Sequence, residues 1–256
     1  MALNLIMLGP PGAGKGTQAE RFARGRGIPK VSTGDILRDA VHGRTEIGNR
    51  VMAIMDRGEL VSDDVMIPVV RERLERPDAR AGFVLDGFPR TVAQAEALDS
   101  FMDGRGPLIV VDIVVPEAEI VRRLGSRMIC GDCGANAGSA AEATAAVADN
   151  LTRGTGAAAG AAAEAVASVS ALAESERCRR CGGRLVQRAD DSDAVVLERL
   201  KVYHRQTEPL VQYYRDRPTF RTVDGAQLPD QVAEALARAI DGAHLSATVA
   251  DGSGQP

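Results

Sequence analysis

The segment Gly9–Thr17 reads GPPGAGKGT and carries the residue types of a phosphate-binding loop. Its glycines let successive backbone N–H groups converge on a phosphate, and Lys15 adds a positive charge. The apolar run 3–8 precedes the loop and a helix-compatible stretch follows it, so the positive end of a helix would also face the phosphate. We therefore predict a nucleotide polyphosphate site made by Gly12, Ala13, Gly14, Lys15, Gly16 and Thr17.

The loop departs from the pattern G-x-x-x-x-G-K-[ST] after its lysine. Position 16 is Gly, and the hydroxyl comes one residue later, at Thr17. A direct bond from this hydroxyl to Mg²⁺ is therefore not indicated. The alternative for the whole segment is a surface turn rich in Gly and Pro, which the flanking strand and helix disfavour.

Four cysteines form two C-x-x-C pairs, a spacing typical of a zinc ribbon. Between the pairs lie 44 residues, against about 15 to 20 in the usual pattern. A longer loop adds little entropic cost to closure, so the site is still expected. Zinc, free thiols and redox disulfides remain the alternatives for Cys130, Cys133, Cys178 and Cys181.

Composition narrows the class of protein. The 256 residues are 45% hydrophobic and only 3% aromatic, which predicts a large aliphatic core. A formal net charge of -4 argues against a general nucleic-acid binder. No signal peptide or bilayer-length apolar run is indicated, so we expect a soluble, cytoplasmic protein with no membrane partner. We also expect a monomer.

Strands alternate with helices along most of the chain, which predicts an α/β fold with a parallel sheet covered on both faces. A helix opened by Pro116 should carry Arg122, Arg123 and Arg127, with the last two on one face. The final helix is expected over 229–243, followed by a frayed tail. We expect strands at 3–8, 28–31, 82–86, 108–115 and 220–223.

The motifs resemble, as a set and in order, those of adenylate kinases of the long, lid-bearing kind. They are GPPGAGKGTQA, STGDILR, DGFPRT, RRLGSR, LVQRADD and LERLKVYH. The resemblance implies a P-loop nucleoside monophosphate kinase fold with a parallel five-stranded sheet flanked by helices. Its implied divisions are a core at 1–31, 62–126 and 194–256, a clamp for the monophosphate at 32–61, and a lid at 127–193.

The resemblance also assigns the acceptor pocket for AMP. Thr33 and the backbone of 59–61 would face adenine, Arg38 and Arg90 the phosphate, and Gln94 the adenine edge. Arginine grips phosphate in two places, and an amide both donates to and accepts from adenine. The implied AMP set is Thr33, Arg38, Glu59, Leu60, Val61, Gly87, Phe88, Pro89, Arg90, Gln94, Arg188 and Arg199.

For ATP the resemblance adds Arg123, Arg127 and Gln227 to the phosphate loop, and Asp86 would orient Mg²⁺ through water. The implied reaction is Mg·ATP + AMP ⇌ 2 ADP, which maintains the balance of adenine nucleotides. Charge stabilisation carries such chemistry without a strong base. The implied catalytic residues are Lys15, Asp86, Arg90, Arg127, Arg188 and Arg199.

Other possibilities stay open from the sequence. A UMP/CMP or GMP kinase is the rival within the class, and a regulatory nucleotide-binding module is the rival outside it. Lids with four cysteines in this family hold a structural zinc. The Ala/Gly-rich insertion at about 135–173 is expected to be a mobile appendage, with a weak helix at 157–173 as the alternative.

Overall fold

The computed structural model describes residues 2–134, 136–139, 177–178, 180–187 and 193–252. The chain divides into two compact units. The larger unit comprises Met1–Ile120 and Ala194–Pro256, and the smaller one comprises Val121–Asp193. The proposed insertion at 135–173 lies outside the described residues except for 136–139, and so does the helix considered for 157–173.

The larger unit is built on a five-stranded sheet in the order β2-β3-β1-β4-β8, and the strand pairs are all parallel. This confirms the predicted fold class. The strands are β1 (Leu3–Leu8), β2 (Lys30–Ser32), β3 (Gly82–Asp86), β4 (Leu108–Val114) and β8 (Phe220–Asp224). Since parallel strands end at the same edge, the loops after β1 and β3 are neighbours.

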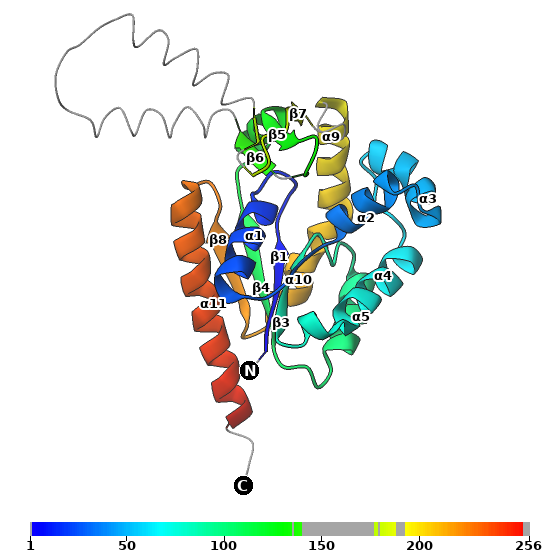
Figure 1. The fold of residues 1–256 in the computed structure, drawn as a ribbon. Helices are drawn as coiled ribbons and strands as arrows, with labels where there is room; N and C mark the ends of the chain where they lie inside the picture. Colours follow the sequence, from blue (N-terminus) through cyan, green and yellow to red (C-terminus); the bar gives the residue numbers. More distant parts are fainter. Residues whose placement is uncertain (1, 135, 140–176, 179, 188–192, 253–256) are drawn as a thin grey trace, which may run out of the picture. The chain divides into compact units, whose positions relative to one another are not determined.

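Helices cover both faces of this sheet (Figure 1). On one face α1 (Lys15–Arg26) packs beside α11 (Pro229–Gly252), which continues beyond the expected end at residue 243. On the other face lie α4 (Asp63–Glu75), α5 (Val92–Met102) and α10 (Pro209–Tyr214). A short 3-10 turn, η1 (Pro77–Ala79), connects α4 to β3.

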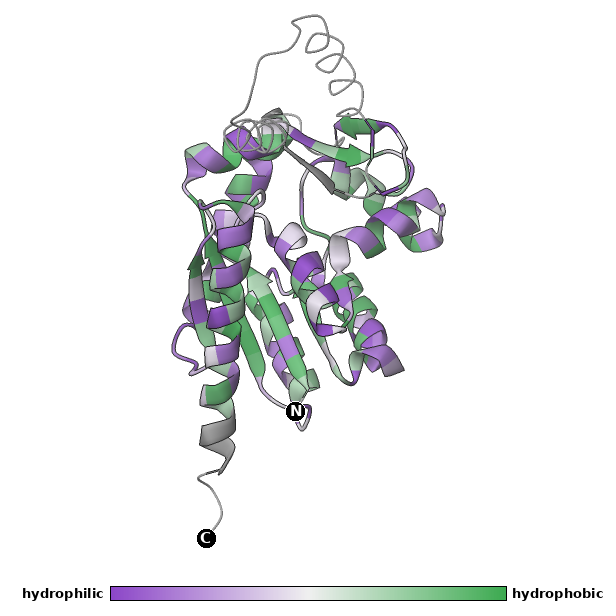
Figure 2. Cartoon of the chain, turned by 60° about the vertical axis from the view of Figure 1, so that its left-hand side comes forward, coloured by the Kyte–Doolittle hydropathy of each residue, from purple (hydrophilic) through white to green (hydrophobic). Residues whose placement is uncertain are grey.

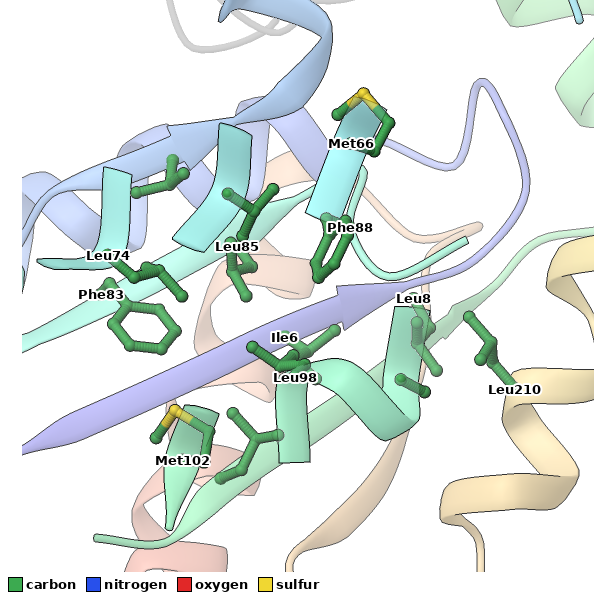
Figure 3. Close-up of a cluster of buried hydrophobic side chains, with 14 of the residues drawn as sticks. Ile6, Leu8, Met66, Leu74, Phe83, Leu85, Phe88, Leu98, Met102 and Leu210 are labelled. Atoms are coloured by element: carbon green, nitrogen blue, oxygen red, sulfur yellow. The ribbon is translucent and has the colours of Figure 1, made fainter. Parts of the chain in front are cut away.

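The core on the α4/α5 side uses the alternation of β-strand side chains. Ile6 and Leu8 of β1 and Phe83 and Leu85 of β3 point to this face, and all are at most 3% exposed. Figure 3 shows them against side chains of the covering helices, among them Leu98 of α5. The sheet strands are accordingly the most apolar part of this unit in Figure 2, whereas polar residues lie on the outer helix faces.

Two helices leave the sheet between β2 and α4. Helix α2 (Thr33–His42) begins after Ser32, whose hydroxyl accepts a hydrogen bond from the Asp35 N–H at 3.3 Å. Helix α3 (Glu46–Asp56) is capped in the same way by Thr45, which accepts from the Gly48 N–H at 3.1 Å. Such caps satisfy backbone donors that a helix leaves unpaired, so they fix where each helix starts.

The segment after the smaller unit is helical with one irregularity. Helix α9 (Asp193–Val202) passes into a π-helical turn, η3 (Tyr203–Thr207), and Pro209 then opens α10. Proline is tolerated at this first position because its missing N–H would be unpaired there anyway.

The smaller unit contains the end of α6 (Glu117–Gly125) and an antiparallel sheet of three strands. The strand order is β6-β5-β7, with β5 (Arg127–Cys130), β6 (Asn136–Ser139) and β7 (Leu185–Gln187). Strand β5 pairs Ile129 with Val186 of β7. The two cysteine pairs are thus brought together by one small sheet.

None of the helices in the described part of the chain combines the length and the apolar composition needed to cross a bilayer.

Candidate active site

The phosphate loop joins β1 to α1 as the sequence predicted. Gly9 has φ 129°, and a Cβ there would lie 2.5 Å from the Ile113 carbonyl oxygen of β4. Only glycine allows the loop backbone to pass this close to strand β4. This contact positions the loop against the sheet. Gly14, with φ 91°, is the residue before α1.

The N-terminus of α1 has the features of an anion site. Gly14 supplies no side-chain cap, and the first turn holds no acidic residue. Its backbone N–H groups and the helix dipole therefore favour a bound anion. The Lys15 ammonium donates to the carbonyls of Gly9 and Pro10 at 2.6 and 2.7 Å, so the cation lies across the loop.

Asp86 ends β3 beside this loop, close to Gly16. A Cβ at position 16 would lie 3.2 Å from Asp86 Oδ2. A larger side chain at position 16 would contact that carboxylate. Gly16 thus leaves room for an acid next to the phosphate loop, where a carboxylate can orient a hydrated Mg²⁺.

Asp112 is a charged residue near the loop that the sequence analysis missed. It lies on β4 opposite Leu8, is 7% exposed, and its Oδ1 has no hydrogen-bond partner among the described residues. Burial raises its pKa above the usual value; Lys15 opposes this shift and Glu208 reinforces it. The sequence could have indicated this residue, because it is the single acid inside the apolar run 108–114.

The acceptor residues Thr33, Gly87 and Arg90 are brought together by one carbonyl group. The Gly87 oxygen accepts from Thr33 Oγ1 and from Arg90 Nε, both at 2.8 Å. Gly87 has φ 84°, and a Cβ there would lie 2.9 Å from both Thr33 Oγ1 and Arg90 Nη2. Glycine is thus required for this convergence at the end of β3. Phe88 is buried and Pro89 follows it through a cis peptide bond.

Gln94 lies in the first turn of α5, next to this group. The residue is 2% exposed, and its side chain bonds to Asp63 and to the backbone of Arg90. Thr91 caps α5 by accepting from the Gln94 N–H at 3.2 Å. The residue chosen for the adenine edge is therefore held in place by the protein itself.

Arg38 lies on α2 and bonds to Asp35. Burial raises the pKa of Asp35, but the hydrogen bond and charge of Arg38, together with Lys30, bring it below its usual value. At the end of the 32–61 segment Val61 is buried, Leu60 is half-buried and Glu59 is exposed. Glu59 pairs with Arg57 at 2.8 Å, leaving its backbone as the expected adenine contact.

Arg199 lies on α9 in the larger unit. A Cβ at Gly58 would lie 2.8 Å from its Cγ, so this arginine packs against the segment expected to hold AMP. Gln227 follows β8 and donates to Asp224 at 3.2 Å. A Cβ at Gly225 would lie 3.3 Å from the Ala13 oxygen, so the Gln227 loop runs beside the phosphate loop.

The expectation that Arg123 and Arg127 share a helix face is wrong. Helix α6 ends at Gly125, and Arg127 opens strand β5. Pairing of Met128 with Gln187 holds this segment extended, so the four-residue helical spacing does not apply. Arg188 lies outside the described residues.

The four cysteines of the smaller unit form one cluster. Their sulfur atoms all lie within 4.8 Å of one another, and none is in a disulfide. Cys130 and Cys181 approach to 3.4 Å, and Cys133 and Cys178 to 3.6 Å. A tetrahedral Zn²⁺ with bonds of about 2.3 Å needs sulfurs roughly 3.8 Å apart, so the cluster fits that metal.

Backbone donors favour thiolate in this cluster. The Arg180 and Cys181 N–H groups lower the pKa of Cys178 to about 7. The Gly183 N–H also lowers the pKa of Cys181, but the neighbouring Cys133 and Cys130 outweigh it and raise that pKa to about 12. Four adjacent thiolates therefore need a bound cation to coexist.

A phosphate loop at the sheet edge, beside an arginine-bearing turn, defines the class of P-loop nucleoside monophosphate kinases. The family model described as adenylate kinase matches residues 7–219. The chain is 44% identical to an adenylate kinase of Archaeoglobus fulgidus over 88% of this chain and 92% of the relative. It is 43% identical to those of Moorella thermoacetica, over 93% and 98%, and Clostridium acetobutylicum, over 91% and 96%. The chain belongs to the adenylate kinase family.

Reversible phosphoryl transfer between ATP and AMP is accordingly its activity, and the predicted enzyme class is confirmed.

Proposed function

We propose that donor and acceptor nucleotides meet at the carboxyl edge of the large sheet. The observation that carries this proposal is the adjacency of β1 and β3, in which Met7 pairs with Asp86. The phosphate loop follows the first strand and the Gly87 turn follows the second. ATP would bind from Gly12 to Thr17, and AMP would bind between Thr33 and Arg90.

The residues near this edge divide into those that bind ATP and those that bind the acceptor. The N–H groups of α1 and the Lys15 ammonium bind the ATP phosphates, while Arg38, Arg90 and Arg199 bind the acceptor phosphate. The arginines bring donor and acceptor oxygens together and balance the charge that spreads over the transferred group. Asp86 would orient the hydrated Mg²⁺ that accompanies ATP, and the ion would supply positive charge beside the phosphates.

The remaining assignments rest on sequence motifs. We propose that Arg123, Arg127 and Arg188 bind nucleotide phosphates during turnover, and that Gln227 contacts ATP adenine through its backbone. Segments 32–61 and 127–193 would act as clamp and lid, which exclude water from the reaction. The cysteine cluster would hold a structural Zn²⁺, and a reducing compartment such as the cytoplasm would keep its thiols available. We propose a monomer as the working form.

Acceptor choice tests the proposal most directly. The protein is mixed with Mg·ATP and, separately, AMP, CMP, UMP or GMP, and products are separated by chromatography. Rapid ADP formation with AMP alone supports the acceptor pocket, whereas equal transfer to CMP or UMP contradicts the adenine contacts. ATP binding without transfer to any acceptor would favour a regulatory module.

Arg199→Ala tests the charge-stabilising set. Loss of an arginine that stabilises transferred phosphoryl charge should lower kcat about 10³-fold. Arg238→Ala is the matched control, since that side chain is 74% exposed on α11. Steady-state turnover near the wild-type value in Arg199→Ala would remove this residue from the site.

A further inference from the structure

The side-chain amide of Gln94 is held by two protein groups at once. Its Nε2 donates to Asp63 Oδ1 at 2.6 Å, and its Oε1 accepts from the Arg90 backbone N–H at 2.8 Å. Gln94 as a whole is 2% exposed, so water does not compete freely for these bonds. The amide is therefore fixed in both position and orientation.

Only one orientation of this amide satisfies both partners. A carboxylate accepts hydrogen bonds and a backbone N–H donates them. A flipped amide would therefore place its oxygen against the Asp63 carboxylate and its N–H group against the Arg90 N–H. Asp63 is itself anchored, because Thr91 Oγ1 donates to its Oδ2 at 2.9 Å. The carboxylate cannot turn away without losing a second bond.

The fixed amide leaves one N–H and one oxygen lone pair for a ligand. Adenine presents an acceptor at N1 and a donor at its 6-amino group, which complement that pair. Hypoxanthine and guanine present a donor at N1 and an acceptor at O6, which require the flipped amide. The orientation set within the protein therefore distinguishes 6-aminopurines from 6-oxopurines.

We propose that Asp63 is a positioning residue that sets acceptor specificity by locking the amide of Gln94 for 6-aminopurine monophosphates. This inference rests on the proposed placement of AMP against Gln94. Asp63 is the first residue of α4, two residues after the 32–61 segment, and does not itself touch the base. It acts through the amide alone.

Asp63→Asn tests the lock with little change of shape. An asparagine can accept from or donate to the amide, so only the Arg90 N–H then opposes the flip. Replacing a charge-assisted hydrogen bond by a neutral one should reduce the AMP-to-IMP ratio of kcat/KM about tenfold. The KM for ATP should stay unchanged. The matched control is Asp64→Asn, an exposed acid in the same helix turn, which should keep the wild-type ratio.

Two further variants separate the possible outcomes. Thr91→Val keeps the carboxylate but removes the hydroxyl that holds it, and should lower the ratio about threefold. Gln94→Leu removes the amide and should abolish discrimination between AMP and IMP. If Gln94→Leu lowers the AMP-to-IMP ratio while Asp63→Asn and Thr91→Val keep it, the proposal that Asp63 orients the amide is contradicted. If Gln94→Leu also keeps it, the placement of AMP against Gln94 is wrong as well.

Discussion

The two units of the chain are stabilised in different ways. The larger one covers a parallel sheet on both faces and buries aliphatic and aromatic side chains from strands and helices alike. In the described part of the smaller one, the buried hydrophobic side chains are Leu124, Cys130 and Cys178. Burial of apolar surface can hold the first unit together, whereas the second, under the proposal made above, would depend on a Zn²⁺ bound by its cysteines.

Removal of metal should produce the largest difference between the units. In small zinc-binding peptides the binding of structural zinc contributes about 10 to 16 kcal/mol to the free energy of folding. After zinc is stripped by a chelator, hydrogen exchange should lose protection at β5 and β7 and keep it at β1, β3 and β4. Re-addition of Zn²⁺ is the control. Unchanged protection at β5 in metal-free, reduced protein would contradict a structural role for zinc.

Leu98→Ala should destabilise the larger unit by about 2 to 5 kcal/mol, because a fully buried leucine leaves a cavity. Leu98 is 0% exposed, and Leu197, which is 54% exposed, provides the control Leu197→Ala. Urea unfolding measures both changes. Zinc content should remain that of the wild type, and a fall in zinc content would show that the two units are not independent.

Asp112→Asn should stabilise the larger unit at neutral pH. Burial raises the pKa of Asp112 above 3.8, so ionisation of this carboxyl opposes folding. That penalty is present above the pKa of the folded state and disappears as pH falls towards 3.8. The variant should therefore have a higher Tm than the wild type at pH 7, and the difference in Tm should become smaller as the pH falls. Equal Tm values from pH 4 to 7 would contradict this.

Val186→Ala should have the smallest effect. Val186 lies on β7 and is 38% exposed, so little apolar surface is lost. We expect a change below about 0.5 kcal/mol in the stability of the zinc-loaded smaller unit, measured by hydrogen exchange at β5. A cost like that of Leu98→Ala would show that apolar packing stabilises both units.

Much of the larger unit could be predicted from the sequence, because strands and helices alternate with clear apolar patterns. The strand that precedes Gly9 and the turn that follows Asp86 are where the motifs put them. The helix expected to end at residue 243 continues to Gly252, and Ala243 and Ala247 are still buried along it. The apolar pattern of the sequence did not predict where that helix ends.

Contacts between distant segments could not be predicted. The sequence places Arg127 on the helix opened by Pro116, but in the structure it begins strand β5 and pairs with Ser139 of β6. The bond from Gln94 to Asp63 likewise joins residues 31 positions apart. Motifs indicated which residues form the acceptor pocket, but not which groups orient them.

The bonds of Lys15 to its own loop have a consequence for nucleotide affinity. The ammonium has already given up part of its hydration and much of its side-chain freedom to the carbonyls of Gly9 and Pro10. An arriving phosphate exchanges partners with a lysine that is already ordered, so little entropy is lost in arranging that side chain. Part of the entropy cost of ordering Lys15 is thus met within the protein, before the phosphate binds.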